Sequence, residues 1–508
     1  MLAYHYLSAL ELVGAASGAE QEHELEANAI RYLALAGERA LGLDVERAEA
    51  SLAKALALAP AGHPERASLL ERWAKAALQQ NRLQETRAAL EEALALYRQQ
   101  DASVAAGRVL TALARVLARL GDPHHEEALA EALALLEAQP AGPELVAAYT
   151  ELAGARFIGG AFREAIAAAE RALALAAELG VAEPAHALGV RGAARASLGD
   201  RQGLEDQRRA LTLALAQGEG RAAAVAYNNL AIVSWQYDGP QVALDACREG
   251  IDFCERRGIA ELALGIAGMS TTFLAERGLA ERALAEAGRV AERMQAAGDV
   301  VFSEPRSVQL RLLAERGGHE HVPGIDELVA TARESGEPQL YATVFSAAAL
   351  LLLAHGHRQD ASELLAELAQ LPGIYAEVYY AAALPALVRT ALALRQPELA
   401  KLLVDGVEPR TPLVEHALSA SRAELEAAGD HAEAVALYAE AAERWRTFGN
   451  VPERAYALLG QGRSLAALGN LESKVPLREA RDLFASMGFT PAVAEVDGVL
   501  GSPSAAAL

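Results

Sequence analysis

Turn-forming residues recur along this chain at a nearly constant spacing, and this period limits the possible folds more than any other feature. Ten of the eleven successive intervals are 39 or 40 residues long, and one interval is 33 residues long. The positions are Gly42, Asn81, Gly121, Gly160, Gly199, Gly239, Gly278, Gly317, Gly356, Gln396, Gly429 and Gly469. A second series lies about half a period later, at Gly180, Gly218, Gly258, Gly298, Gly336, Gly373, Gly449 and Gly488. Such a period is typical of repeats in which each unit contains two segments and two turns.

Both segments of a unit have the periodicity of an amphipathic helix. In residues 161–179 the apolar positions recur at steps of three and four: Ala165, Ala168, Ala169, Ala172 and Leu175. Prolines mark the expected helix starts, at Pro64, Pro123, Pro184, Pro240, Pro338, Pro397, Pro412 and Pro452. The abundant Ala, Leu, Glu and Arg favour helix, and only 5% of the residues are aromatic. We therefore expect an all-α fold, an α-solenoid of about twelve antiparallel helix pairs.

Charge and apolar runs exclude several classes of protein. The chain has 46 basic and 68 acidic residues, and its net charge of −22 disfavours nucleic-acid binding. The longest apolar run, near residues 340–354, is shorter than the roughly 18–20 residues of a membrane span. Cys247 and Cys254 would lie about 10 Å apart on one helix, too far for a disulfide, so they are expected to be free thiols. We expect a cytoplasmic protein without a membrane partner.

One unit matches a known repeat pattern closely. In that unit the turn Gly429 is followed by Asp430, Ala434, Tyr438 and Ala441, and this unit resembles a tetratricopeptide repeat (TPR). The segment AYNNLAIVSW at 226–235 is similar to a first helix of that family. The period of this chain is five or six residues longer than the 34 residues usual for a TPR.

Arrays with such a long period resemble the C-terminal regions of large bacterial signalling proteins. These include transcriptional activators of the maltose-regulator type, and nucleotidyl cyclases or kinases fused to a STAND-type ATPase. The opening HYLSALELVGAASG resembles the junction that follows such an ATPase. We expect an N-terminal helix or junction at 1–19, a long TPR-like array at 20–405, C-terminal TPR-like units at 406–500 and a disordered tail at 501–508, with a bend at the irregular interval.

Signatures of catalysis are scarce. The chain has no Gly-Lys pair and therefore no Walker phosphate loop, and it has no G-x-S-x-G elbow. Pairs of histidines lie at expected turns, for example His124 with His125 and His319 with His321, where solvated loop residues are common. Most paired carboxylates are expected on solvated helix faces. We expect no enzymatic activity, no metal and no cofactor.

Candidate binding residues lie on the first helices, which line the concave surface in the family that this chain resembles. They are Asn228, Asn229, Trp235, Tyr237 and Arg311. The aromatic rings could hold a peptide or pack between helices. The asparagines could bind a peptide backbone or serve as caps, and Arg311 could face the groove or form a surface ion pair.

The main hypothesis is a non-enzymatic interaction scaffold, or a regulatory or sensory module, that binds a peptide or ligand on its concave face in bacterial signalling or transcriptional regulation. Its partner would be a protein or peptide, including an ATPase or cyclase module. One alternative is a C-terminal fragment of a multidomain nucleotidyl cyclase or STAND ATPase. Another is a hydrolase that uses one of the histidine clusters at the turns.

Overall fold

The computed structural model describes residues 5–6, 8–10, 19–41, 44–80, 82–296, 304–318, 324–427 and 429–501. Within these ranges the secondary structure is helical and contains no strand. The helices follow one another as twelve consecutive pairs, from α2–α3 to α24–α25, and end with α26. The chain is thus an all-α, TPR-like repeat protein, as the glycine period predicts. It forms two compact units, Met1–Val190 and Arg191–Leu508, which are described separately.

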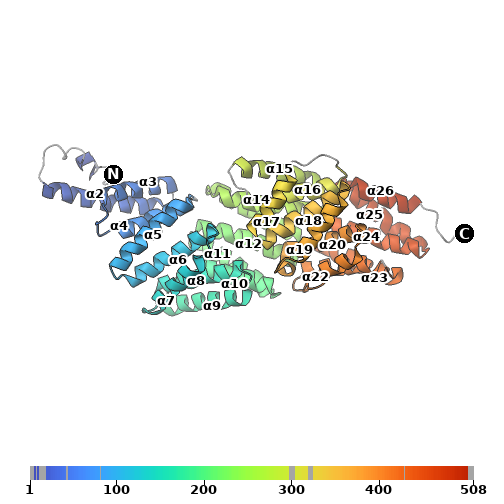
Figure 1. Cartoon of the computed structure of the whole chain (residues 1–508), viewed down its shortest axis with the longest axis horizontal. Coiled ribbons are helices and arrows are strands. Elements are labelled where there is room, and N and C mark those ends of the chain that lie inside the picture. The colour runs from blue at the N-terminus through green and yellow to red at the C-terminus, as the bar shows by residue number, and fades with distance from the viewer. Residues whose placement is uncertain are drawn as a thin grey trace. The chain divides into compact units, whose positions relative to one another are not determined.

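The first unit stacks four complete helix pairs (Figure 1). They are α2 (Ala19–Ala40), α3 (Val45–Leu58), α4 (Arg66–Gln79), α5 (Leu83–Gln99), α6 (Ser103–Arg119), α7 (His125–Glu137), α8 (Pro143–Ile158) and α9 (Phe162–Leu179). Apolar residues of α5, α6 and α7, such as Leu90, Val109 and Leu129, form one continuous core. Each pair thereby buries an apolar face that it cannot bury alone.

The boundary between the units lies within α10 (Ala185–Ser197). The second unit continues with α11 (Gln202–Ala216), α12 (Gly220–Asp238), α13 (Pro240–Arg256), α14 (Ala260–Glu276), α15 (Ala280–Ala296), α16 (Glu304–Glu315), α17 (Ile325–Ser335) and α18 (Pro338–Ala354). It ends with α19 (Arg358–Ala369), α20 (Val378–Ala393), α21 (Pro397–Val404), α22 (Pro412–Glu426), α23 (His431–Phe448), α24 (Val451–Ala467), α25 (Lys474–Met487) and α26 (Thr490–Gly501). Short 3₁₀ turns, η1 (Ile374–Ala376) and η2 (Leu471–Ser473), precede α20 and α25.

Small residues face the neighbouring helix, as the periodicity predicts. In α9 the buried positions are Ala165, Ala168, Ala169, Ala172, Leu175 and Ala176. Alanine at these positions lets the helix backbones approach closely. Cys247 and Cys254 are both buried and unpaired on α13, and burial raises the pKa of Cys247 to about 12. These thiols therefore fill the core, as expected.

The turn residues adopt the backbone conformation that the glycine series predicts. Most glycines of both series have a positive φ, a backbone conformation that residues other than glycine rarely adopt. Where the series has Gln396, the preceding Arg395 takes the positive φ of 64° instead. Gly42, Asn81 and Gly298 lie outside the described residues. The prolines Pro240, Pro338, Pro397, Pro412 and Pro452 occupy the first turns of their helices.

Within the second unit, early helix pairs lie beside late ones (Figure 1). Helix α12 contacts α22, α14 contacts α24, and α16 contacts α26. Turns also meet: Thr490 donates a hydrogen bond to the carbonyl of Arg316 at 2.7 Å, and Arg277 donates one to the carbonyl of Gly449 at 3.3 Å. We call this line of contacts between the turns after α10, α12, α14 and α16 and the C-terminal helices the seam. The seam encloses the inner helices of this unit.

The predicted segments, 1–19, 20–405, 406–500 and 501–508, do not correspond to the two compact units, which meet at residues 190 and 191. The short helix before the two prolines of the 33-residue interval is present as α21, of eight residues. The bend near residue 406 and the division into 20–405 and 406–500 stay predictions. The expected junction at 1–19 and tail at 501–508 lie largely outside the described residues. In the ranges given above, no helix has both the length and the apolarity that crossing a bilayer requires.

Gly239 provides a test of the seam. Its φ is 91° and its ψ is 176°, and a Cβ at this position would lie 2.2 Å from the carbonyl oxygen of Phe448. We expect Gly239→Ala to destabilise the protein by about 3 kcal/mol, because both the backbone conformation and the close approach exclude a side chain. Gly258 also has a positive φ but has open space around the Cβ position. The matched Gly258→Ala variant should cost only about 1 kcal/mol. Urea unfolding measures the free energy of unfolding of both variants. Equal losses of stability in Gly239→Ala and Gly258→Ala would contradict the close packing of the seam.

Candidate ligand-binding site

The second unit contains an inner cavity of about 100 Å³. Its walls come from the first helices of successive pairs, α12, α14, α16, α18, α20 and α24, together with Phe489 from the turn before α26. This volume is several times what a single water molecule needs. The cavity therefore has room for a group of about the size of one side chain. Five of these helices, α12 to α20, are the first helices of successive pairs, and α24 and Phe489 join them across the seam.

Four carboxylates and one guanidinium group line the cavity: Glu276, Glu304, Glu315, Glu453 and Arg311. Glu276 and Glu304 are buried, at 3% and 8% exposure. Glu276 accepts a hydrogen bond from the indole N–H of Trp235 at 2.8 Å, and Glu304 accepts one from the Gln339 amide at 3.1 Å. Neither carboxylate has a basic partner within ion-pair distance among the described residues.

Burial changes the ionisation of these groups. It raises the pKa of Glu276 to about 7, although attraction by Arg311 and the hydrogen bond from Trp235 act against this shift. It raises the pKa of Glu304 to about 7 in the same way. Both carboxyl groups therefore change charge near neutral pH.

Three polar groups of the cavity wall have no hydrogen-bond partner among the described residues. The hydroxyl groups of Tyr379 and Ser307 are buried and unpaired, and their residues are 6% exposed. The carboxylate of Glu304 lies close enough to the Tyr379 hydroxyl to interact with it without completing a hydrogen bond of good geometry. Arg311 is partly exposed and forms neither a hydrogen bond nor an ion pair with any described residue. Because buried polar groups are nearly always paired, unpaired ones in a cavity wall suggest a missing ligand.

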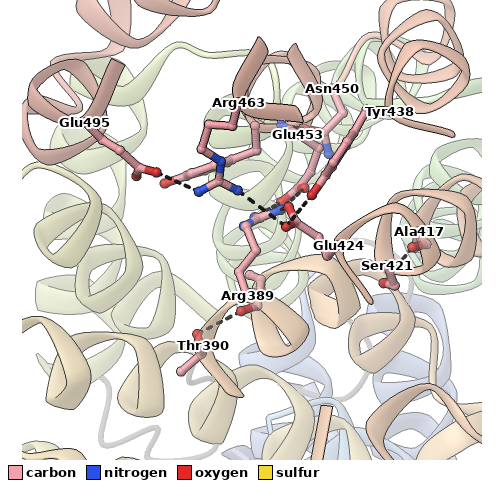
Figure 2. Close-up of polar contacts among 12 residues, drawn as sticks. Arg389, Thr390, Ala417, Ser421, Glu424, Tyr438, Asn450, Glu453, Arg463 and Glu495 are labelled. Carbon is pink, nitrogen blue, oxygen red and sulfur yellow. Dashed lines mark hydrogen bonds and ion pairs between the residues drawn. The ribbon is translucent and has the colours of Figure 1, made fainter. Parts of the chain in front are cut away.

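A buried polar network lies next to the cavity (Figure 2). Arg389 of α20 donates two hydrogen bonds to Glu453 of α24, at 2.7 and 2.8 Å. Glu424 of α22 lies 3.9 Å from Arg389 and accepts a hydrogen bond from Tyr438 at 2.7 Å. Burial alone would lower the pKa of Arg389, but the attraction of the Glu453 and Glu424 carboxylates outweighs the effect of burial, so the pKa of Arg389 is raised. The guanidinium group is therefore permanently charged and fixed in orientation.

Tyr456 connects this network to the cavity. The guanidinium carbon of Arg389 lies 3.9 Å from the centre of the Tyr456 ring. The Tyr456 hydroxyl donates a hydrogen bond to the carboxylate of Glu315, which lines the cavity. Two of the four cavity carboxylates, Glu315 and Glu453, are thus held by neighbours outside the cavity, whereas Glu276 and Glu304 have only neutral donors.

The structure brings two of the five candidate residues together. Trp235 and Arg311 both line the cavity. Asn228, Asn229 and Tyr237 do not: the two asparagine side chains hydrogen-bond to each other at 3.3 Å, and the Tyr237 hydroxyl donates to the carbonyl of Ala196 at 3.1 Å. A binding role for these residues, within the cavity or elsewhere, stays a prediction. His319 and His321 lie outside the described residues.

The buried carboxylates of the cavity are absent from the sequence-based candidates. Glutamates in an acidic helical chain are expected on solvated faces, but Glu276, Glu304 and Glu424 are buried. A signal was present in the sequence. The tetrapeptide Ala-Glu-Arg-Gly occurs at 275–278 and again at 314–317, one period apart, and its glutamates are Glu276 and Glu315. Equal repeat positions place both carboxylates on the same inner surface.

Comparisons with known proteins give only distant similarities. No family model matches the chain, and no curated protein matches it. Among solved structures, the apo form of the quorum sensor NprR from B. thuringiensis is 14% identical, with a TM-score of 0.39 over 76% of this chain and 99% of that chain. The Cut9 and Hcn1 hetero-tetramer of the APC/C has 13% identity, a TM-score of 0.39, and coverage of 94% and 95%. Yeast Tom70 has 13% identity, a TM-score of 0.31, and coverage of 93% and 95%. Similarity at this level assigns no function to the chain.

The Arg389 pair makes a prediction about stability. We expect Arg389→Met to destabilise the protein by about 3 kcal/mol, because Glu453 and Glu424 lose the charge that compensates their burial. Arg446, which pairs with Glu443 at the surface, gives the control Arg446→Met, and this variant should unfold like the wild type. Urea unfolding of the two variants provides the comparison. A loss no larger for Arg389→Met than for the control would show that the network does not stabilise the fold.

Glu276 makes a prediction about pH. Its folded pKa of about 7 lies above its unfolded value, so the folded protein binds more protons between about pH 4.5 and 7, and stability falls as pH rises through this window. Glu276→Gln keeps an acceptor for Trp235 and removes the buried charge. We expect it to stabilise the protein by about 3 kcal/mol at pH 8 and to change little at pH 5. The exposed Glu292→Gln variant should change little at either pH. A pH-independent effect of Glu276→Gln in thermal unfolding would contradict the raised pKa.

Proposed function

We propose that this chain is a non-enzymatic binding module that holds a ligand in the inner cavity of residues 191–508. The cavity, with the unpaired hydroxyl groups of Tyr379 and Ser307 in its wall, is the observation that carries the proposal. Ligand sites are concave, mainly apolar, and contain a few convergent polar groups. In this cavity aromatic, alanine and other apolar side chains line the wall together with the four carboxylates, Arg311 and several hydroxyl groups.

The arrangement of the walls favours a regulatory or sensory role over simple storage. A ligand in the cavity would contact helices that are far apart in the sequence, such as α12, α16 and α24, at the same time. Since those helices are held together at the seam, occupancy would stabilise the closed arrangement relative to an open one. A ligand shifts such an equilibrium only by its difference in affinity for the two states. Binding of a small group would thus change the arrangement of the helices, and with it the surface that the repeats present to a partner.

The partner that responds to this change is part of the proposal. The solenoid offers a long helical surface to a protein or peptide, and the resemblance of the opening residues to an ATPase junction supports a STAND ATPase or cyclase module as that partner. In that setting the chain would act in the cytoplasm in bacterial signalling or transcriptional regulation. Whether such a module is encoded with this chain can be read from the neighbouring coding sequence.

A variant that fills the cavity tests the binding function. Ala383 of α20 lines the cavity and is partly exposed, so Ala383→Phe should fill the space without unfolding the protein. Ala393, exposed at the end of the same helix, gives the matched control Ala393→Phe. We expect a thermal-shift screen of small charged metabolites and short peptides to find ligands that stabilise the wild type and the control but not Ala383→Phe. Ligands that stabilise all three proteins equally, or no ligand at all, would contradict the proposal.

A further inference from the structure

The uneven charge of the cavity wall suggests which chemistry its ligand has. Four carboxylates and Arg311 line the cavity, and Arg389 neutralises Glu453 from outside through two hydrogen bonds. When the remaining carboxyl groups are ionised, Glu276, Glu304 and Glu315 outweigh Arg311 by two charges. An ionised, desolvated carboxylate without a basic partner is costly, and a bound cation would remove that cost.

The unpaired hydroxyl groups are an independent indication of a bound ligand. Tyr379 is 94% buried, and its oxygen, like that of Ser307, completes no hydrogen bond in the described part of the chain. Ser307 and Glu304 lie on one turn of α16, with Arg311 one turn further along. Hydroxyl oxygens and carboxylates are acceptors that a primary ammonium group, with its three N–H donors, can satisfy together.

Aromatic rings complete the surroundings of such a group. Trp235 and Tyr379 both line the cavity, and their ring centres lie 5.4 Å apart. Aromatic rings attract cations through their negatively charged faces. The apolar residues Ala382, Ala383 and Ala386 leave space for a short alkyl chain beside them. Carboxylates, hydroxyls and rings together favour an organic cation over an anion or a neutral alcohol.

We propose that this cavity binds a primary alkylammonium group, with Glu304, Glu276 and the hydroxyls of Tyr379 and Ser307 as its acceptors. The proposal rests on the binding function above and names the ligand class for the same site. Arg311 acts as the charge that offsets part of the carboxylate excess while the cavity is empty. The group could belong to a free amine or to the lysine side chain of a peptide, because both offer the same chemistry at a cavity of this size.

Calorimetric titration of the full chain tests the ligand class with three probes of matched size: n-butylammonium, 1-butanol and butyrate. We expect saturable binding of n-butylammonium alone, lost in Ala383→Phe and kept in Ala393→Phe. A parallel titration with the acetylated and amidated peptide Gly-Lys-Gly distinguishes the sources. Binding of the peptide would assign the lysine side chain, and its failure beside bound butylammonium would assign a free amine; either result supports the proposal.

Single variants separate a binding role from a structural one. Glu304→Gln should weaken n-butylammonium binding about tenfold, and Tyr379→Phe about fivefold. Because the Tyr379 hydroxyl completes no hydrogen bond of good geometry, Tyr379→Phe should leave the unfolding temperature unchanged or raise it, whereas loss of a structural contact would lower it. Arg311→Gln should tighten binding, since it removes a like charge from the cavity. Weaker butylammonium binding in Arg311→Gln would overturn the proposal.

The pH dependence provides a further check. The charged and titratable groups that line the site are Glu276, Glu304, Glu315, Glu453, Arg311 and Tyr379. Arg389, Tyr456, Glu377 and Cys247 lie next to these groups, outside the cavity. Glu276 and Glu304, whose pKa values are raised to about 7, become ionised between pH 6 and 8, whereas the alkylammonium stays charged. Affinity should therefore increase over this range. No binding of n-butylammonium, or binding of butyrate instead, would overturn the proposed ligand class. The binding function itself would still hold if another ligand bound the wild type and Ala393→Phe but not Ala383→Phe.

Discussion

The structure depends on the burial of one apolar face of each helix pair against the next pair. A single pair, such as α8 and α9, has more apolar surface than it can cover by itself, and the neighbouring pair provides the cover. Alanine at positions such as Ala165 and Ala169 keeps the helix axes close, so the stacking is tight and regular. Because every pair repeats the same packing, residues at a given repeat position lie on the same face of their helices along the array.

This regularity explains why several carboxylates lie close together on the inner surface of the second unit. The first helices of its pairs all face inward, and the seam between early and late turns encloses them. Carboxylates that would be solvated on a straight array, such as Glu276 and Glu304, are thereby taken out of water. Their raised pKa values are a result of this enclosure. The permanently charged Arg389 is compensated by Glu453 and Glu424, whereas Glu276 and Glu304 have no basic partner within ion-pair distance among the described residues.

The helix pairs and their period could be predicted from the sequence, whereas the closure of the second unit and most of the cavity wall could not. The glycine period, the proline starts and the alanine stripe each depend on contacts within one pair or between adjacent pairs, so they are visible in a window of about 40 residues. Trp235 and Arg311 could be predicted as candidates because they lie on first helices, and both line the cavity; their binding role stays a prediction. The pairing of Arg389 with Glu453, 64 residues away, and the approach of Tyr456 to Glu315, 141 residues away, depend on how the unit closes on itself. No local pattern contains that information.

The two sets of turns differ in how much additional chain they can tolerate. The turns at Gly199, Gly239, Gly278 and Gly317 meet other residues of the second unit at close range, whereas Gly218, Gly258 and Gly336 have empty space where a side chain would begin. Insertions, fused domains and labels should therefore be accepted at the latter three turns and rejected at the former four. Along this part of the chain, residues 199–336, the turns between pairs can be enlarged without disturbing the contacts at the seam.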